Sequence, residues 1–527
     1  MTEFSSSGQS VWLATVRIEE RAALADDLQV DVCVIGAGIA GMTTAYLLAK
    51  EGKSVAVIED GSIGGGMTGF TTAHLMSALD DRYFQLERYH GEDGARLAAA
   101  SHRAAIDTIE RIIGEEQIDC DFRRLDGYLF APPNDDSDDI EREYEAARRA
   151  GLSDVRKVEA APIAGFNTGP ALLFPRQGQF HPLKYLDGLA RAFERLGGKI
   201  FCKTHARAVS GGDNACVITE NGDLIAANAI VVATNVPIND LFAIHTKQAP
   251  YTSYVIGARI PRGSVATALY WDTRQSADDA ESGEAPYHYV RLADGEPGAS
   301  GDSADDVLIV GGEDHKSGQA HDGAERFGRL ESWARERWPQ LGEVLFRWSG
   351  QVMEPNDGMA FIGHNPIDNS NIYVATGDSG TGMTHGTIAG LLLSDLICSR
   401  PNPWQKLYDP GRVTLRAAGD FVKENVNVAL QYAKGFLGSG EAGNESDIAP
   451  GEGAVLRKGL RKIAVYRDPD GAVHEMSAVC PHLGCVVAWN AVEKTWDCPC
   501  HGSRFDCMGA VVNGPANKGL EARAERQ

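Results

Sequence analysis

The chain has 527 residues, which is too long for one hydrophobic core, so we expect two or three domains. Its hydrophobic content of 43% and charged content of 23% are typical of a soluble globular protein. The 50 basic and 73 acidic residues give a net charge of -23, which disfavours binding to nucleic acid or to an anionic membrane surface. No apolar run approaches the length that spans a bilayer, and residues 1–10 lack the regions of a signal peptide, so we expect a cytoplasmic protein.

Residues 1–27 are predicted to form a polar N-terminal arm, anchored by Trp12 and Leu13. After this arm, residues 31–59 have the order apolar strand, glycine-rich turn, helix, second strand and acid. The two strands are predicted over 32–35 and 55–58. This order is typical of a dinucleotide-binding unit.

Three glycines, Gly36, Gly38 and Gly41, occupy the turn with the spacing GxGxxG. In such a motif the first glycine permits the tight turn, the second lets the backbone approach a pyrophosphate, and the third lets the helix pack on the sheet. The phosphates then meet unpaired N–H groups at the positive end of the helix. Glu59 ends the second strand, where its carboxylate can accept hydrogen bonds from an adenosine ribose. The motif alone fits either FAD or NAD.

The following segments alternate between helical and extended patterns. A glycine-rich loop at 61–73 is expected beside the cofactor. The helices predicted from apolar spacing and few breakers are 86–118, 135–150 and 183–196, the last with Pro182 in its first turn. Residues 128–130 are predicted to be a short strand, and residues 171–183 to be mostly loop.

Further strands are predicted where apolar residues run together or alternate, at 199–202, 215–219, 229–233, 251–260, 287–292 and 307–310. The last three alternate with polar partners, which is typical of a half-buried antiparallel sheet. We expect this sheet to form a second lobe, apart from the parallel one, within residues 170–360.

Nucleotide-fold character returns near the end of this lobe. A strand at 371–375 leads into the glycine-rich segment 377–384 and an apolar helix at 387–397. A second cofactor contact is one interpretation of this corner, and a packing feature is the other. Residues 435–453 are rich in Gly, Ser and acids and are predicted to be an interdomain linker.

Beyond the linker, strands at 455–466 and 471–479 flank an Asp470-Gly471 hairpin turn. They predict a small all-β domain, which we place at 454–527.

This domain holds a cluster of cysteines and histidines at short spacing. Cys480 and His482 form a C-x-H pair, and Cys498 and His501 form a C-x-x-H pair. The set suits an iron–sulfur cluster in which the two thiolates bind one iron and the two imidazoles bind the other, an arrangement that raises the reduction potential. A structural zinc site is the alternative, although zinc sites more often use C-x-x-C pairs.

With these ligands, residues 446–520 resemble a Rieske [2Fe-2S] domain, and the resemblance includes the later Gly514-Pro515 loop. It implies that Cys485 and Cys500 are the additional pair that forms a disulfide between the cluster loops in Rieske proteins of cytochrome bc complexes. Cys507 has no role in that pattern and is assigned to packing. The few residues after Gly519 leave little for the last strand that such domains have.

Residues 28–434 resemble the superfamily of D-amino acid oxidase, glycine oxidase and sarcosine oxidase, because a Rossmann motif, an antiparallel lobe and a returning glycine-rich corner follow in that order. The resemblance implies FAD and an α/β Rossmann-type FAD-binding domain with an antiparallel β substrate lobe. The positions that it assigns to the cofactor are Gly36, Gly38, Gly41 and Glu59 for the ADP half, Gly66, Thr68, Thr72 and Ala73 by the flavin, Ala206 and Ala233 near the adenine, and Gly382, Met383 and Thr384 near the isoalloxazine or ribityl chain.

The same resemblance implies oxidation of a C–N bond by hydride transfer to the flavin, which needs no strong base if the amine arrives deprotonated. Amino acid oxidases of this type usually place an arginine for the substrate carboxylate in the Trp-containing strand before the final glycine segment, and residues 348–355 of this chain contain none. A simple amino acid substrate is therefore disfavoured.

Candidate substrate contacts are Gln179, His181, Tyr287, Tyr289, Arg291 and Gln351. Tyr289 and Arg291 share one strand face, so Arg291 is a candidate carboxylate anchor, with a salt bridge as the alternative. His181 is expected to be a turn residue, and His74 to be either solvent-facing or catalytic.

Together the two resemblances imply a flavin-dependent oxidoreductase that oxidises an amine or amino-acid-like substrate and passes single electrons out through its own Rieske cluster. The alternative is a redox-responsive or electron-transfer protein that a protein partner reduces. A Rieske oxygenase component is a weaker option, because no 2-His-1-carboxylate iron site stands out. We expect a small-molecule substrate and an unidentified electron acceptor or donor protein, but neither nucleic acid nor membrane as partner.

Overall fold

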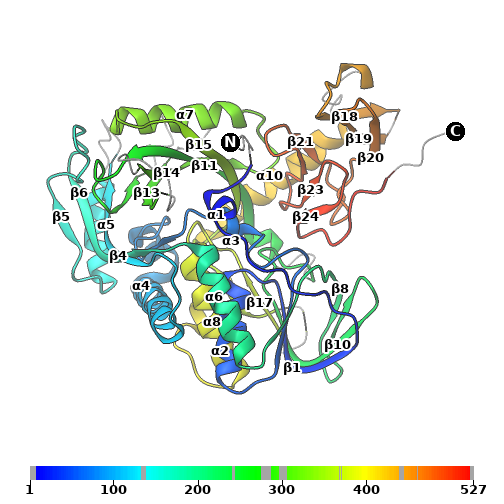
Figure 1. The fold of residues 1–527 in the computed structure, drawn as a ribbon, viewed down its shortest axis with the longest axis horizontal. Coiled ribbons are helices and arrows are strands. Elements are labelled where there is room, and N and C mark those ends of the chain that lie inside the picture. The colour runs from blue at the N-terminus through cyan, green and yellow to red at the C-terminus, as the bar shows by residue number, and fades with distance from the viewer. Residues whose placement is uncertain are drawn as a thin grey trace.

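The computed structural model describes residues 8–131, 138–239, 244–273, 287–295, 305–366, 368, 371–437, 444–459 and 461–522. Figure 1 shows a nucleotide-binding region, a second sheet covered by a long helix, and a C-terminal domain, orange to red, at one side of both. Among the helices of these residues, none is long and apolar enough to cross a membrane.

The nucleotide-binding region is built on a sheet in the order β16-β17-β10-β1-β2-β7. Its strands are β1 (Leu28–Ile35), β2 (Val55–Ile58), β7 (Lys199–Phe201), β10 (Leu224–Val232), β16 (Phe361–His364) and β17 (Ile372–Thr376). β1 pairs in parallel with β2 and β10, and β10 pairs in parallel with β17. All four residues of β2 are buried, as expected for a parallel strand covered on both faces. The antiparallel strands β8 (Ala206–Ser210) and β9 (Cys216–Thr219) extend this sheet from β10.

Helices cover the parallel sheet and include those predicted from the sequence. Those that contact its strands are α2 (Ile39–Lys50), α6 (Pro182–Arg195) and α8 (Gly382–Ile397), while α4 (Tyr83–Glu116) packs on α6 and α8, and α5 (Asp139–Arg149) packs on α4. The helix predicted at 135–150 begins partly outside the described residues, and α4 has a kink at Gly91. Helices α2 and α8 pack closely because α8 presents glycine: a Cβ on Gly390 would lie 2.5 Å from Cγ2 of Thr43. Short helices are α1 (Val11–Thr15), α3 (Met67–Phe70) and α9 (Gln405–Tyr408).

The second sheet is largely antiparallel, as predicted, and has the order β15-β11-β14-β13-β12-β4-β6-β3, with β5 paired to β6. The predicted bounds of 170–360 were too narrow, because three of its strands, β3, β4 and β5, come earlier in the chain. Its strands are β3 (His74–Leu75), β4 (Arg123–Phe130), β5 (Arg156–Val158), β6 (Ala171–Gln179), β11 (Gln248–Pro261), β12 (Leu269–Asp272), β13 (His288–Ala293), β14 (Asp305–Lys316) and β15 (Val344–Pro355). Helix α7 (Gly323–Arg337) packs on β11 and β14 and covers one face (Figure 1).

The prediction that residues 171–183 are mostly loop was wrong, because β6 runs from Ala171 to Gln179 and pairs with β4 and β5. The register against β4 shifts between Leu125 and Gly127, opposite Pro175 and Arg176. A proline at such a bulge does not remove a required ladder hydrogen bond. The proline and glycine that indicated a loop in the sequence are therefore accommodated within a strand.

The C-terminal region begins after helix α10 (Ala418–Leu437), so the helix includes the first residues of the predicted linker 435–453. Residues 438–443 lie outside the described residues. The strands that follow are β18 (Glu452–Lys458), β19 (Arg461–Arg467), β20 (Val473–Ser477), β21 (Ala488–Asn490), β22 (Thr495–Asp497), β23 (Arg504–Asp506) and β24 (Val511–Asn513). The remaining short elements are 3-10 turns at His245–Lys247, Leu415–Ala417 and Glu445–Asp447.

Two predictions for this domain meet different outcomes. The hairpin turn at Asp470-Gly471 is confirmed between β19 and β20, where Gly471 has a φ of +91°. The single strand predicted at 455–466 was wrong, because the chain turns near Gly459, which has a φ of +67°, and forms two strands. The last strand of the domain was expected to be short, and among the described residues an isolated β-bridge between Met476 and Ala522 occupies its place.

Candidate flavin site and cluster-binding loops

The GxGxxG turn has the close contacts that its glycines permit. A Cβ on Gly41 would lie 1.9 Å from the carbonyl oxygen of Gly36, and a Cβ on Gly36, whose φ is +106°, would lie 2.5 Å from the carbonyl oxygen of Ala233. Gly38 is the N-cap of α2 and provides no side-chain cap, while the N–H of Ile39 donates to the hydroxyl of Thr68 at 3.1 Å across the mouth of the turn. The turn therefore has the cradle that a pyrophosphate requires.

The carboxylate of Glu59 lies at the end of β2 and joins the turn to the strand. Its Oε2 accepts from the N–H of Ala37 at 2.7 Å, and its Oε1 accepts from the N–H of Gly61 at 3.0 Å. Burial raises the pKa of Glu59. The residue also lines the cavity described next, so its predicted contact with a ribose stays a prediction with suitable geometry.

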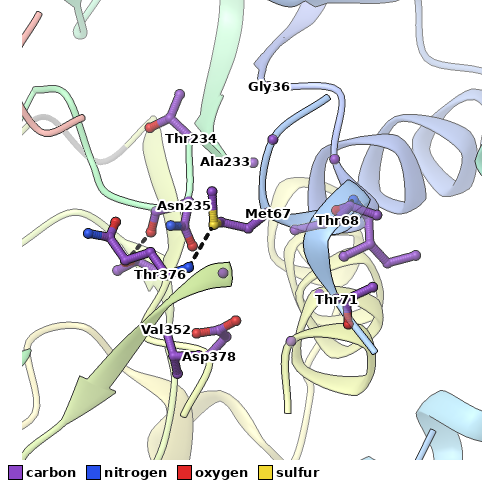
Figure 2. Close-up of a pocket in the computed structure, with 18 of the residues that line it drawn as sticks. Gly36, Met67, Thr68, Thr71, Ala233, Thr234, Asn235, Val352, Thr376 and Asp378 are labelled. Carbon is purple, nitrogen blue, oxygen red and sulfur yellow. Dashed lines mark hydrogen bonds between the residues drawn. The ribbon is translucent and has the colours of Figure 1, made fainter. Parts of the chain in front are cut away.

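A cavity of about 300 Å³ runs from this turn toward the second sheet. Figure 2 shows Met67, Thr68 and Thr71 on one side of it and Asn235, Thr376 and Asp378 among the residues on the other. The predicted cofactor positions that line it are Gly36, Gly38, Glu59, Gly66, Thr68, Thr72, Ala206, Ala233, Gly382 and Met383. Residues from both glycine-rich corners therefore meet at one cavity, as a long cofactor requires.

Three predicted cofactor positions are not among the described residues that line the cavity and lie beside it instead. Gly41 packs on the turn, as its part in the motif requires. The carbonyl oxygen of Ala73 accepts a hydrogen bond from Arg291, and the hydroxyl of Thr384 bonds to Nδ1 of His102 at 2.8 Å. Ala73 and Thr384 therefore lie behind the residues that line the cavity and hold those residues in place.

Of the candidate substrate contacts, Tyr287, Tyr289 and Gln351 line the cavity. The hydroxyl of Tyr289 bonds to Oγ of Ser253 at 2.5 Å, and burial raises its pKa. Gln179 and His181 are not among the described lining residues. His181 is the N-cap of α6, where its side chain accepts from the N–H of Lys184 at 3.3 Å.

Arg291 does not reach the cavity, which contradicts its interpretation as a carboxylate anchor. Its side chain is 2% exposed, and its guanidinium donates to the carbonyl oxygens of Thr72 at 3.2 Å, Ala73 at 2.8 Å and Phe180 at 3.0 Å. The indole of Trp12 covers it, with the guanidinium carbon 5.1 Å from the ring centre. Arg291 therefore fixes the loop under the flavin cavity, and the alternative of a salt bridge is replaced by these backbone contacts.

Replacing Arg291 with methionine is expected to lower the free energy of unfolding by about 3 kcal/mol, because three buried carbonyl groups lose their donor. Urea denaturation of the cofactor-loaded protein measures this. Arg123→Met is the matched control on strand β4 of the same sheet, since its half-exposed ion pair with Asp294 is worth about 0–1 kcal/mol. Unchanged stability together with a raised KM would instead restore the carboxylate anchor.

Sequence reasoning missed several lining residues, among them Ser253, Trp271 and Asp378. Asp378 lies in the glycine-rich segment 377–384, which was the available signal, whereas nothing local marks the other two. Its Oδ1 accepts from the N–H of Met353 at 3.2 Å, and burial raises its pKa to about 6.

His74 also lines the cavity and is 9% exposed, so the solvent-facing alternative was wrong. Its Nδ1 bonds to the hydroxyl of Thr72 at 3.0 Å, and its Nε2 lies 3.3 Å from the carbonyl oxygen of Val290. Burial lowers the pKa of His74 to about 3, so the imidazole is neutral at physiological pH.

The four predicted cluster ligands lie together on two loops of the C-terminal domain. Cys480 and Cys498 are buried and free of disulfides, and the hydrogen bond between their thiols lowers the pKa of Cys480. The rings of His482 and His501 have centres 5.1 Å apart. Burial lowers the pKa of His482 to about 3 and that of His501 to about 4, which leaves both in the neutral form that metal binding needs.

Two further observations test whether this donor set fits a [2Fe-2S] cluster. Both ring nitrogens of His482 are buried and have no hydrogen-bond partner within the part of the chain that is described. Cys485 and Cys500 form a disulfide between the two loops, as the resemblance implied. The sulfurs of Cys485, Cys498 and Cys500 lie within 4.8 Å of one another because this disulfide joins two of them, and its sulfurs are not free to bind metal. The set with unused donors is therefore Cys480, His482, Cys498 and His501.

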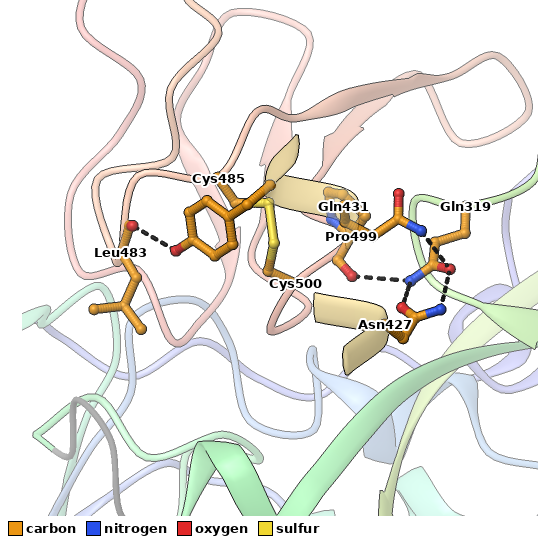
Figure 3. The surroundings of a disulfide bond; sticks show 8 residues. Gln319, Asn427, Gln431, Leu483, Cys485, Pro499 and Cys500 are labelled. Carbon is orange, nitrogen blue, oxygen red and sulfur yellow. Dashed lines mark hydrogen bonds between the residues drawn. A yellow bond between two sulfur atoms is a disulfide. The ribbon is translucent and has the colours of Figure 1, made fainter. Parts of the chain in front are cut away.

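The cluster-binding loops pack directly against the cavity region. Gln351 donates to the carbonyl oxygen of Gly502 at 2.8 Å, next to His501, and the ring of His245 lies with its centre 4.9 Å from that of His482. Figure 3 shows Gln319 and Asn427 at the carbonyl of Pro499, beside the disulfide, with Gln319 donating at 3.1 Å. Residues 511–514, 516 and 517 of the C-terminal domain form part of the cavity wall.

A dinucleotide cradle that opens into a cavity under an antiparallel sheet, with a cluster-binding loop hydrogen-bonded to a residue of the cavity wall, defines a flavoprotein oxidoreductase joined to an iron–sulfur domain. The sequence comparison agrees: the chain matches the family "FAD dependent oxidoreductase" (DAO) over residues 31–396 and the Rieske [2Fe-2S] domain over residues 440–523. The protein belongs to the DAO family of FAD dependent oxidoreductases and carries a C-terminal Rieske domain. The first domain binds FAD, and the second binds a [2Fe-2S] cluster.

Known proteins share the whole architecture or its first part. The Rieske 2Fe-2S iron-sulfur protein YhfW of Bacillus subtilis (strain 168) is 32% identical over 516 residues, 97% of each chain. The gamma-glutamylputrescine oxidoreductase of Escherichia coli (strain K12) is 27% identical over 383 residues, 71% of this chain and 85% of its own. Glycine oxidase from Geobacillus kaustophilus has the same fold, with a TM-score of 0.58 at 20% identity over 73% of this chain and 99% of its own.

Proposed function

We propose that this oxidoreductase oxidises an amine or amino-acid-like small molecule at its FAD and passes the electrons one at a time through its Rieske cluster to an acceptor protein. Bound FAD supplies two-electron oxidation of a C–N bond, and a bound [2Fe-2S] cluster accepts one electron. The observation that carries the proposal is that the Rieske domain forms part of the wall of the flavin cavity. The acceptor protein and a cytoplasmic location remain predictions from the sequence.

Several residues favour an amine over a carboxylate-bearing amino acid. Arg291 is committed to backbone carbonyls, and β15 supplies Gln351 to the cavity where amino acid oxidases were expected to place an arginine. The carboxylates of Asp80 and Asp378 line the same cavity. Because a negative wall attracts a cation, this lining suits an ammonium group.

Aromatic residues in the same wall support this substrate class. Trp271, Tyr287 and Tyr289 line the cavity, and the rings of Tyr287 and Tyr289 have centres 5.6 Å apart. The hydroxyl of Tyr287 lies 3.5 Å from Oδ2 of Asp80. Aromatic faces beside a carboxylate bind alkylammonium groups through cation–π attraction. The relative named for gamma-glutamylputrescine, an amine, agrees with this chemistry.

The test is an anaerobic titration of the protein with both cofactors bound. Primary and secondary amines and amino acids are added one class at a time while flavin absorbance and the paramagnetic signal of the reduced cluster are followed together. We expect one amine class to bleach the flavin and then to reduce the cluster. Flavin bleaching with a permanently oxidised cluster would refute the electron outlet, and reduction only by a protein donor would refute the amine dehydrogenase.

A further inference from the structure

We infer that Gln351 is the positioning residue that couples the flavin cavity to the cluster-binding loop, and that it is not a substrate contact. The inference rests on the proposed flavin-to-cluster electron transfer and assigns it a route in this chain. Gln351 lies on β15, is 2% exposed, and lines the cavity. It therefore lies on the strand where an arginine was expected, but it offers a neutral amide in place of a positively charged guanidinium.

Both ends of the Gln351 amide are bound to the Rieske domain. Its Nε2 donates to the carbonyl oxygen of Gly502 at 2.8 Å, and its Oε1 accepts from Nδ2 of Asn513. Its backbone N–H donates to the sulfur of Met67, at 3.1 Å, on the short helix that lines the other side of the cavity. A buried amide held by two segments of another domain has one fixed orientation. Both polar groups of this side chain are therefore already bonded within the protein, whereas a substrate contact needs a polar group that can bond to the substrate.

Few bonds separate Gln351 from the predicted cluster ligand His501. Gly502 follows His501 directly in the sequence, so one hydrogen bond and the backbone between these two residues connect the cavity wall to a cluster ligand. A hydrogen bond transmits electronic coupling better than an open gap of the same length. The contact thus provides a continuous connection from the cavity wall to His501, which would hold one iron of the cluster.

The cluster loop is shaped to allow this contact. Gly502 has a φ of +80°, and a Cβ there would lie 2.6 Å from Nε2 of Gln351 and 2.6 Å from Cβ of Pro250. A side chain at this position would push the loop away from β15 and β11. The close approach of the two domains next to His501 therefore depends on glycine.

Gln319 offers a matched control. It also donates to a carbonyl of the same cluster loop, that of Pro499 at 3.1 Å, and it pairs with Asn427 of α10 (Figure 3). It is not among the described residues that line the cavity. Removing its amide tests the cost of losing an interdomain hydrogen bond without touching the connection to the cavity.

The experiment compares Gln351→Met and Gln351→Glu with Gln319→Met, each carrying both cofactors. Methionine keeps the length of the side chain without its hydrogen bonds, and glutamate keeps the acceptor for Asn513 but loses the donor to Gly502. Anaerobic stopped-flow mixing with the reducing amine resolves flavin reduction and cluster reduction at separate wavelengths. We expect both Gln351 variants to slow the cluster step by at least about tenfold more than the flavin step, the scale seen for residues that support metal ligands. Gln319→Met is expected to keep the wild-type ratio of the two rates.

A second readout does not depend on turnover. The paramagnetic spectrum and midpoint potential of the chemically reduced cluster should shift in both Gln351 variants, and amide hydrogen exchange in residues 498–505 should rise. A raised KM and slower flavin reduction with an unchanged cluster step would make Gln351 a substrate contact and overturn the inference. Unchanged rates and spectra, or loss of the cluster from both variants, would also overturn it. If the wild-type cluster never accepts electrons from the flavin, the proposed function is refuted, and the route through Gln351 is refuted as well.

Discussion

Cys498→Ser is expected to abolish the iron–sulfur cluster while leaving the flavin bound. The cluster needs both thiolates on one iron, and Cys498 is buried in contact with Cys480 on the other loop. Serine offers a hydroxyl that stays protonated at neutral pH, so the affinity for iron should fall at least about tenfold. Iron and sulfide analysis, together with the visible and paramagnetic spectra of the purified protein, measures the loss.

Cys507→Ser is the control for this experiment. Cys507 belongs to the same domain and is half buried, but it is outside the ligand set, and its carbonyl oxygen accepts from the indole of Trp496 at 3.3 Å. We expect this variant to keep its iron. Full iron content in Cys498→Ser, with an unchanged spectrum, would show that the ligand assignment is incorrect.

Gly41→Ala is expected to remove most of the bound FAD. The new Cβ would lie 1.9 Å from the carbonyl oxygen of Gly36 and 3.1 Å from its carbonyl carbon, and both are backbone atoms of the phosphate-binding turn. Relief of this overlap must displace the turn or the helix, at about 3 kcal/mol, which corresponds to about a hundredfold weaker binding. The ratio of flavin to protein after purification, and the Kd for added FAD, measure the effect.

The matched control is Gly114→Ala in helix α4. A Cβ at Gly114 meets no atom within 4 Å, so alanine should leave FAD binding unchanged and slightly favour the helix. If Gly41→Ala bound FAD as tightly as the wild type does, the turn would not be the phosphate cradle.

The fold was predictable where one local pattern had one structural solution. Residues 32–35 of β1 and all of β2 are apolar and buried on both faces, as expected where a parallel sheet is covered on both sides, and this pattern is visible in the sequence. Strand β6 was missed because Pro175 and Gly178 indicate a loop in isolation, and only the partner strand β4 shows that a bulge accommodates the proline. Pairing between distant strands overrode the local signal.

The site was predictable to the same extent and for related reasons. The ligands Cys480 and Cys498 are marked by spacing within each loop, so no knowledge of the distant chain is needed. Arg291 was misplaced because strand alternation gives the face of a side chain but not what covers that face. Here Trp12, from the N-terminal arm, lies over it. The contact between Gln351 and Gly502 depends on how two domains dock, which no local pattern encodes.

Because residues 511–514, 516 and 517 form part of the cavity wall, the binding of the cofactor and the docking of the C-terminal domain are expected to be coupled. A ligand that fills the cavity up to this wall touches both domains, so its binding free energy includes the docking of one on the other. By thermodynamic reciprocity, docking raises the affinity for the ligand by the same factor by which the ligand favours docking. If FAD reaches this wall, we expect the chain without flavin to hold its iron–sulfur domain more weakly than the chain with flavin bound.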